Sequence, residues 1–391
     1  MDSVTLTLRT AGESHGPCML AFVEGLPAGL EVDTAFIDAE LARRQGGYGR
    51  GARQRIEDDK VVLLAGVRRG RTIGAPVVLQ VVNRDSRLDD LERTPPVHRP
   101  RPGHADLAGA LKWFTDDCRP VLERASARET AARVAAGALA RLLLRPFGVE
   151  TFGYVMGGMD VLVEPDVHAG SFQALRRLRD ASEVYLPDAA ASERFVERIH
   201  AAKTARDTVG GLCRVHVLGA PAGLGTCAQW CRKLDARLAA AVMGIQAFKS
   251  VEIGLGRECA FRRGSDVHDP IAFDPARRDE PHGGFVRSRN NAGGIEGGMT
   301  NGMPVVVTGA MKPIATLGQG MPSVDLRSGE PQPSAYERSD VCAVAAASVV
   351  MEHAVAFEVA AAFLERFGGD SMDQLRAHVD ASAALRRRGG P

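Results

Sequence analysis

Alternation of apolar and polar side chains predicts strands in both halves of the chain. Val, Thr and Leu alternate over residues 4–8, and the run CRVHVL alternates over residues 213–218. Two short apolar runs predict further strands over residues 61–64 and 76–82. The predicted strands are thus separated by long segments whose structure must be predicted from other patterns.

Helical periodicity predicts helices over residues 33–44, 126–145, 234–249 and 340–367. The second is the clearest, because Ser126 and Glu129 match an S-x-x-E capping box and Pro146 and Gly148 follow its end. We expect the last helix to begin at Asp340, where the positive end of the helix dipole favours an ionised carboxylate.

Long polar segments over residues 45–55, 83–105 and 281–303 are predicted to be loops. They are rich in Arg, Gly, His and Asn, and loops longer than about 12 to 15 residues in compact proteins are usually functional or disordered. This composition favours function. Alternating strands and helices predict an α/β (α+β) fold in one domain over residues 1–375, with a flexible tail over residues 376–391.

Composition narrows the class of protein. Of the 391 residues 45% are apolar, which suffices for a packed core, and the net charge of +1 gives no overall attraction to nucleic acid or to membranes. Seven cysteines without Cys-x-x-Cys spacing indicate free thiols in a reducing compartment and no metal site. The longest near-apolar run, residues 341–351, is too short to span a bilayer, and the amino terminus lacks a signal-peptide pattern. We therefore predict a cytoplasmic protein.

A basic, glycine-rich stretch, RRQGGYGRGAR, covers residues 43–53. Five arginines lie within residues 43–55 with no acidic residue among them. Arginine binds phosphate and carboxylate bidentately, and glycine lets the backbone approach a ligand closely. The stretch fits a site for a small polyanion, but it also fits a solvated or RNA-contacting basic surface, because a basic run is most often surface charge.

Three further stretches hold groups that can move protons or bind anions: GESHG with His15, RPRPGHADL with Arg101 and His104, and ERSDVCAV with Arg338 and Asp340. Histidine titrates near neutrality and can act as a general acid or base. An isolated loop histidine is more often structural, and His104 could simply pair with Asp106. Asp340 could equally be an ordinary residue at a helix start.

Two more stretches suit a bound phosphate or a flat ring. ERASARETAARVAAG, residues 123–137, surrounds a helix start whose free N–H groups can bind phosphate, although Ser126 could serve only as a cap. NNAGGIEGGMTNG, residues 290–302, has two Gly-Gly pairs but matches neither a dinucleotide-binding motif nor a P-loop. It could pack against a ring or form an irregular structural loop.

Taken together, these stretches resemble the chorismate synthase family. The matching segments follow the family's order and span nearly the whole chain: GESHG (12–16), RRQGGYGRGAR (43–53), RPGHAD (101–106), RASARETAARVAAG (124–137), VMGIQAFKSVEIG (242–254), GGIEGGMTNG (293–302), MKPIATL (311–317) and RSDVCAV (338–344). The resemblance implies a β-α-β sandwich with internal pseudo-symmetry, assembled as a homotetramer.

The resemblance also implies an activity. Members of the family are lyases that convert 5-enolpyruvylshikimate 3-phosphate to chorismate and phosphate by 1,4-anti elimination. The reaction belongs to the pathway to aromatic amino acids. It requires reduced FMN, although the reaction has no net redox change. NADPH or a separate flavin reductase would keep the flavin reduced, since the sequence shows no reductase domain.

The family's functional residues map onto this sequence one by one. His15 would protonate the leaving phosphate, His104 would act near N1 of the reduced flavin, and Asp340 would lie near flavin N5 and help to relay the C6 proton. The substrate anions would be held by Arg44, Arg50, Arg53, Arg101, Arg128 and Arg338. FMN would be contacted by Arg124, Ala125, Ser126, Gln246, Ala247, Gly297, Lys312, Pro313, Ile314, Ala315, Thr316 and Arg338. Arg44 and Arg50 also match the family's NADPH positions.

Three segments depart from the family pattern. Trp113-Phe114 stands where Tyr-Gly is usual, Ser250 stands for Gly, and Ala345 stands for Pro. Because a side chain at Phe114 disfavours positive φ, we expect the turn there to be reshaped. None of the three changes removes a predicted catalytic side chain.

Two other functions remain open. A flavoprotein oxidoreductase acting on a phosphorylated substrate would consume NADPH stoichiometrically. An RNA-binding protein that uses the basic stretch would bind with a steep salt dependence. The near-zero net charge and the aromatic content of only 5% argue against RNA.

Overall fold

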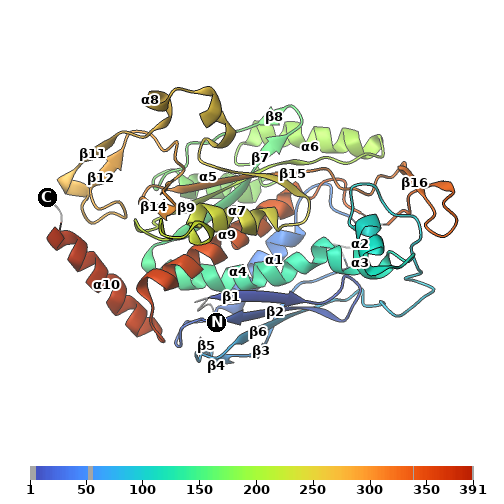
Figure 1. The fold of residues 1–391 in the computed structure, drawn as a ribbon, viewed down its shortest axis with the longest axis horizontal. Coiled ribbons are helices and arrows are strands. Elements are labelled where there is room, and N and C mark those ends of the chain that lie inside the picture. The colour runs from blue at the N-terminus through green and yellow to red at the C-terminus, as the bar shows by residue number, and fades with distance from the viewer. Residues whose placement is uncertain (1–5, 52–55, 338, 390–391) are drawn as a thin grey trace.

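The computed structural model describes residues 6–51, 56–337 and 339–389, with the backbone alone for residues 386–389. Two antiparallel sheets enclose a layer of helices (Figure 1). The strands of the first sheet are, in spatial order, β1 (Thr7–Ala11), β2 (Cys18–Glu24), β6 (Val77–Val82) and β3 (Val61–Ala65). Those of the second are β10 (Phe248–Ile253), β15 (Val305–Met311), β9 (Gly211–Leu218), β7 (Glu150–Gly158) and β8 (Val161–Leu162).

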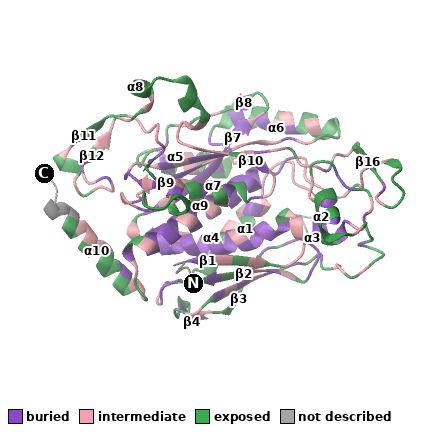
Figure 2. Cartoon of the chain, viewed as in Figure 1, coloured by how far each residue is buried: buried purple, intermediate pink, exposed green. Residues whose placement is uncertain are grey.

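The helices of the middle layer are α1 (Thr34–Gln45), α4 (Thr130–Leu144), α7 (Leu234–Met243) and α9 (Val344–Phe367). Figure 2 shows α4 and α9 as mostly buried, in keeping with their alanine- and valine-rich sequences. The two helices approach so closely that a Cβ at Gly137 of α4 would collide with His353 of α9. Small side chains therefore build the core, as the low aromatic content predicts.

The two halves of the chain repeat one order of elements. Each half runs strand, strand, helix, strand, strand, helix, as β1, β2, α1, β3, β6, α4 and then β7, β9, α7, β10, β15, α9. Each sheet places these strands in the same spatial order, and β3 and β10 each carry an irregular register. The predicted β-α-β sandwich with internal pseudo-symmetry is confirmed. The sequence shows no fixed-period repeat because β1 and β2 are joined by a turn, whereas β7 and β9 are joined by a long connection.

The remaining described elements lie around this sandwich (Figure 1). The helices among them are α2 (Asp106–Trp113), α3 (Arg119–Ala125), α5 (Phe172–Ala181), α6 (Ala189–Thr204), α8 (Gly264–Val267) and α10 (Met372–Gly389). The 3-10 helices are η2 (Ala127–Glu129), η3 (Arg145–Phe147), η4 (Trp230–Arg232), η5 (Gly256–Phe261) and η6 (Pro275–Arg277). Two-stranded ribbons join β4 (Val67–Arg68) to β5 (Arg71–Thr72), β11 (Ile271–Phe273) to β12 (Phe285–Arg287), β13 (Ile295–Glu296) to β14 (Met299–Thr300), and β16 (Pro322–Val324) to β17 (Pro331–Pro333).

The capping box predicted before α4 does not form in the described chain. The Ser126 side chain accepts a hydrogen bond from the backbone N–H of Arg128 at 3.3 Å and so begins η2, and α4 follows at Thr130. The Glu129 carboxylate turns instead to Thr10 and Arg133. Tertiary hydrogen bonds have therefore replaced the local return bond that the sequence pattern suggests.

Three other boundaries differ from the predictions. The first strand begins at Thr7 rather than at residue 4, and residues 1–5 lie outside the described part. The helix predicted over residues 234–249 ends at Met243, because β10 takes up the chain from Phe248. Residues 376–389 of the tail predicted to be flexible lie in helix α10, whose Leu375 is buried.

The last core helix, α9, begins at Val344 and not at Asp340. The expectation that the α9 dipole holds Asp340 in its first turn is therefore wrong. The helix is long and apolar enough to cross a membrane, but 89% of its most apolar stretch is buried inside the fold. The near-apolar run of residues 341–351 is thus only part of a longer helix whose apolar side chains pack in the core.

Phe114 adopts the left-handed conformation, which its side chain was predicted to disfavour. It caps the end of α2 with φ 56° and ψ 47°, and its N–H donates to the carbonyl of Ala110. Its side chain is 96% exposed, so no packing compensates for the backbone strain. The turn is kept despite the missing glycine, at a cost of about 1–2 kcal/mol for a residue with a Cβ.

Replacing Phe114 with glycine should therefore stabilise the protein by about 0.5–1 kcal/mol, since relief of strain exceeds the extra unfolded-state entropy of glycine. Chemical denaturation measures the change. Lys112→Gly is the matched control, because Lys112 lies within α2 and glycine there should destabilise by about 1 kcal/mol. A Phe114→Gly protein no more stable than the unmodified one would show that the turn is unstrained.

Candidate active site

A cavity of about 550 Å³ lies where the ends of the central helices meet. Its wall includes the starts of α4 and α9, the segments that follow α1 and α7, the turn between β1 and β2, and the segments after β6 and β15. A helix start presents unpaired N–H groups and the positive end of its dipole, which favour anions. The volume falls within the range of roughly 300–1,000 Å³ typical of small-molecule and cofactor sites.

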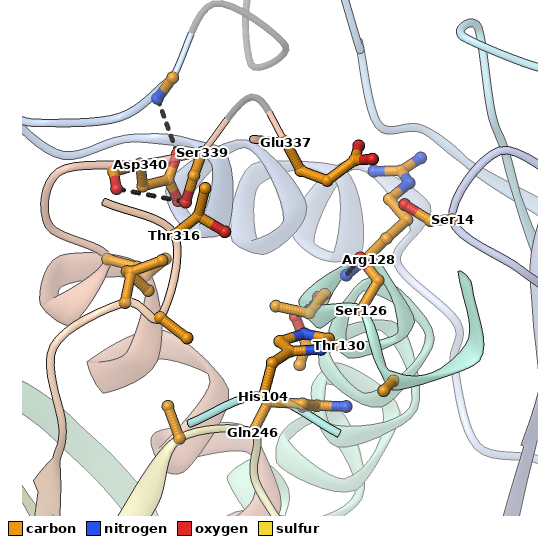
Figure 3. A pocket seen from close by; sticks show the side chains of 18 of the residues that line it. Ser14, His104, Ser126, Arg128, Thr130, Gln246, Thr316, Glu337, Ser339 and Asp340 are labelled. Carbon is orange, nitrogen blue, oxygen red and sulfur yellow. Dashed lines mark hydrogen bonds between the residues drawn. The ribbon is translucent and has the colours of Figure 1, made fainter. Parts of the chain in front are cut away.

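Most of the predicted site residues line this one cavity. They are His15, Arg44, Arg50, Arg101, His104, Ala125, Ser126, Arg128, Gln246, Ala247, Lys312, Ile314, Ala315, Thr316 and Asp340. In Figure 3, Asp340, Ser339 and Thr316 gather on one side of the cavity, and Ser126, Arg128, Thr130 and His104 on the other. The fold thus brings together segments that are far apart in the sequence.

Some predicted residues lie elsewhere. Arg124 donates to the backbone carbonyls of Thr10 and Gly12 at 3.1 and 3.0 Å, so it braces the strand end before His15. Two others outside the described cavity wall are Pro313 and Gly297, the latter in the β13–β14 hairpin. Arg53 and Arg338 lie outside the described residues.

His15 is held by Glu123 of α3. Nδ1 of His15 lies 2.8 Å from Oε1 of Glu123, and the backbone N–H of His15 donates to Oε2 at 2.8 Å. The other ring nitrogen, Nε2, lies 3.3 Å from Nη2 of Arg87 and 3.7 Å from Oδ2 of Asp85. Burial alone would raise the pKa of Glu123, but hydrogen bonds from His15 lower it, so Glu123 is ionised.

His104 has a similar carboxylate partner. Its Nδ1 is hydrogen-bonded to Oδ1 of the buried Asp106, and Nε of Arg101 donates to Oδ2 of the same carboxylate at 2.8 Å. Burial opposes ionisation of Asp106, but hydrogen bonds from His104 and Arg101 lower its pKa. The pairing of His104 with Asp106, which the sequence suggested as a purely structural alternative, is present at the cavity wall and is compatible with catalysis.

Arg44 and Arg128 share one buried carboxylate, that of Asp59. Nη2 of Arg44 lies 2.8 Å from Oδ2 of Asp59, and Nη1 of Arg128 lies 2.6 Å from Oδ1. Burial lowers the pKa of Arg44 to about 10, with nearby Arg128 adding to the shift and Asp59 opposing it. Asp59 therefore allows two guanidinium groups to stand close together in the wall.

Asp340 is anchored by the basic stretch rather than by a helix. The backbone N–H of Gly51 donates to its Oδ1 at 2.7 Å, and Nη1 of Arg50 lies 3.3 Å from its Oδ2. Figure 3 shows Asp340 beside Ser339 at the cavity. The contact joins the segment after α1 to the segment before α9.

The cavity wall is less poor in acids than the basic stretch alone suggests. Its described cationic residues are Arg44, Arg50, Arg87, Arg101, Arg128 and Lys312, and its described carboxylates are Glu57, Asp85, Glu337 and Asp340. Glu123, Asp59, Asp85 and Arg87 were not singled out from the sequence. Asp85 and Arg87 lie in the arginine-rich segment 83–105, whose composition indicated a functional loop. No motif in the sequence points to Asp59.

The fold and the site define an enzyme whose cavity sets two carboxylate-paired histidines beside arginines able to bind a polyanion. A family model described as chorismate synthase matches residues 6–364. The chain is 53% identical over 388 residues to a chorismate synthase of Geobacter metallireducens, covering 95% of this chain and 96% of that protein. It is 53% identical over 379 residues to one of Desulforudis audaxviator, covering 94% of each.

A solved structure described as a crystal structure of chorismate synthase has the same fold, with a TM-score of 0.79, 37% identity and 98% of both chains covered. The chain therefore belongs to the chorismate synthase family. It is accordingly a lyase of the chorismate-forming step of the shikimate pathway, which serves aromatic amino acid biosynthesis.

Proposed function

We propose that this chain converts 5-enolpyruvylshikimate 3-phosphate to chorismate and phosphate by 1,4-anti elimination, with reduced FMN and no net redox change. A C–O bond to phosphate and a C–H bond break, and a new ring double bond forms. The observation that carries the proposal is the convergence of His15, His104 and Asp340 with several arginines on one cavity. Such a site can bind a substrate with one phosphate and two carboxylates.

His15 is the acid that we assign to the departing phosphate. Its Nδ1 is occupied by Glu123, so Nε2 is the ring nitrogen that can pass a proton to a phosphate oxygen. Arg87, beside Nε2, can bind the same anion. The other described wall arginines, Arg44, Arg50, Arg101 and Arg128, orient the substrate's charged groups.

The residues of the opposite wall fit a flat ring with polar edges. Small apolar side chains such as Ala125 and Ala347 leave room for a ring, and among the described residues no group donates to the buried Oε1 of Gln246. An N–H of a bound ring can satisfy that oxygen. We assign FMN to Ala125, Ser126, Gln246, Ala247 and the segment Lys312–Thr316, with His104 toward N1 and Asp340 toward N5. Reduced FMN, when bound, supplies electron density that helps the allylic phosphate leave.

The source of reducing equivalents is a separate part of the proposal. NADPH at Arg44 and Arg50, or a separate flavin reductase, would keep FMN reduced. A spectrophotometric count of NADPH oxidised per chorismate formed tests the redox balance. We expect far less than one NADPH per turnover once the flavin is reduced, whereas one NADPH per turnover would support an oxidoreductase instead.

We further propose a cytoplasmic homotetramer. All seven cysteines lie within the described residues and are free thiols, which suits a reducing compartment. The outer face of the first sheet exposes Phe22, Val62 and Val82, which strand pairing places on one face, and Leu64 is exposed at the register shift of β3. An apolar sheet face of this kind marks a contact surface.

Light scattering should therefore give a particle of about four times the chain mass of 41.6 kDa. Leu64→Glu should reduce the mass, because a charge beside this face opposes its burial. Glu150→Gln, far along the other sheet, is the control and should keep the full assembly. A monomeric unmodified protein would contradict the proposal.

A further inference from the structure

Glu123 holds the turn that carries His15 through three hydrogen bonds. The backbone N–H of Ser14 donates to the Glu123 carbonyl at 3.0 Å, and the backbone N–H of His15 donates to Oε2 at 2.8 Å. Oε1 then lies 2.8 Å from the ring Nδ1. The Glu123 side chain is 1% exposed, so neither of its oxygens is well placed to exchange partners with water. This arrangement fixes both the backbone and the ring of His15.

The same contacts determine which ring nitrogen carries a proton. An ionised carboxylate accepts hydrogen bonds and cannot donate them, so Nδ1 of His15 must be the donor to Glu123. On the other side of the ring, the guanidinium of Arg87 can only donate, so the neutral ring presents Nε2 as an acceptor. A proton that the ring gains or loses is then the one on Nε2.

We propose that Glu123 is a positioning residue that keeps Nδ1 of His15 protonated and thereby makes Nε2 the proton-exchanging atom at the phosphate. The inference rests on the proposed function in taking His15 as the acid. It goes beyond it in assigning the control of that acid to a residue that lies outside the described cavity wall.

Other charged groups also face this pair. In the described chain they are Arg119 of α3, whose Nη1 lies 3.6 Å from Oε1 of Glu123, and Asp85 and Arg87 of the loop after β6. Asp85 and Arg87 are themselves paired at 2.9 Å, so their charges largely offset each other near Nε2. Glu123 is thus the carboxylate in closest contact with the ring.

Glu123→Gln separates charge from shape. If the glutamine oxygen keeps the hydrogen bond from the backbone N–H of His15, its NH₂ group faces Nδ1 and can only donate. Nδ1 has the shorter contact, 2.8 Å to residue 123 against 3.3 Å from Nε2 to Arg87, so the donor at position 123 decides the tautomer and the neutral ring carries its proton on Nε2. The doubly protonated ring also loses its anionic partner. We expect the neutral tautomer of His15 to reverse and the ring to lose its second proton at lower pH than in the unmodified protein.

Magic-angle-spinning NMR of the full chain labelled with nitrogen-15 histidine reads this out without turnover. The signals of His15 are those missing from His15→Ala. The expected result is a protonated Nδ1 in the neutral ring of the unmodified protein and an unprotonated Nδ1 in Glu123→Gln. The same tautomer in both proteins would overturn the proposal.

Activity provides the second arm of the test. Phosphate release with photoreduced FMN should slow by roughly 10- to 100-fold in Glu123→Gln, the range for loss of a hydrogen bond to a charged group. The alkaline limb of kcat/KM should move to lower pH, which a purely structural loss would not produce. Glu150→Gln, which removes an exposed partner of Arg176, is the matched control and should leave rate and profile unchanged.

Different results would overturn the acid role of His15 and the positioning role of Glu123. Normal turnover in His15→Ala would overturn the proposed role of His15, while the NMR result would still decide whether Glu123 fixes the ring. An impaired His15→Ala together with an unshifted pH profile in Glu123→Gln would overturn the positioning role alone. Thermal unfolding of each variant identifies a rate loss that comes from misfolding, and Glu123→Asp, which keeps the charge, should then recover the position of the alkaline limb.

Discussion

Replacing His15 with alanine should slow phosphate release by about 10²- to 10⁴-fold, the usual cost of removing a general acid. Substrate binding should remain detectable, because Arg44 and Arg128 stay fixed on Asp59 whether or not the imidazole is present. His104→Ala should slow phosphate release by a similar factor. Substrate binding should again remain detectable, since Arg101 keeps its own bond to Asp106 at 2.8 Å. The expected pattern is a loss in kcat with a smaller change in substrate affinity.

Stopped assays of phosphate under saturating reduced FMN give kcat, and titration calorimetry with substrate gives the affinity. His168→Ala is the matched control, because His168 lies on an exposed loop before α5. Near-normal turnover in His15→Ala or in His104→Ala would refute the acid role of that residue.

The second large effect concerns stability rather than catalysis. Glu352 of α9 is fully buried, and its carboxylate contacts Arg43 of α1, with Arg141 of α4 at 3.5 Å and Arg179 at 3.6 Å. Burial alone would raise the pKa of Glu352, but the three arginines lower it, so the charge is retained inside the core. Glu352→Ala should cost about 3–5 kcal/mol, because it leaves buried guanidinium groups uncompensated.

Denaturant unfolding monitored by circular dichroism measures this loss. Glu150→Ala removes a half-exposed pair with Arg176 at 3.0 Å and should cost no more than about 1 kcal/mol. Equal losses in the two variants would show that the buried cluster adds nothing beyond a surface pair. A Glu352→Gln variant, which keeps the volume, separates the loss of charge from the creation of a cavity.

The same cluster sets an acid limit to stability. Burial opposes ionisation of Glu40, but Arg43 and Arg141 lower the pKa of Glu40 to about 2. A carboxylate whose folded pKa is depressed stabilises fully above its unfolded pKa of 4.5, and the gain disappears as the pH falls toward 2. The free energy of unfolding should therefore decline over that window, and less so in Glu352→Gln.

Periodicity was a good guide to elements whose pattern is set by local burial. The helix predicted over residues 33–44 is α1. The strands predicted over residues 61–64 and 213–218 lie within β3 and β9, and the one predicted over residues 76–82 begins one residue before β6. Boundaries failed where distant groups decide them. The Glu129 carboxylate accepts a hydrogen bond from Thr10 instead of completing the capping box. Asp340 accepts one from the N–H of Gly51 and lies before the first residue of α9.

The internal pseudo-symmetry left a trace in the sequence that periodicity could not detect. Arg124-Ala-Ser126 precedes the first residue of α4, Thr130, at the same spacing as Arg338-Ser-Asp340 precedes the first residue of α9, Val344. Ala125 and Ser126 of the first segment and Ser339 and Asp340 of the second line one cavity, because each segment leads into the last helix of a half. A comparison of the two halves against each other, rather than a search for a fixed period, would have found it.

The candidate site could be predicted as far as its residues lie in recognisable motifs. His15, His104 and Asp340 each stand in such a motif, and the described ones among the predicted arginines line the cavity except for Arg124. Their carboxylate partners could not be predicted in the same way. Glu123 and Asp59 act through contacts formed only when distant elements pack, and no local spacing encodes those contacts.

The most direct test of the account is anaerobic incubation of the full chain with photoreduced FMN and 5-enolpyruvylshikimate 3-phosphate, with phosphate and chorismate followed together. The account predicts equal amounts of both products while the flavin remains reduced at the end of the reaction. Absence of phosphate release with reduced flavin present would contradict it.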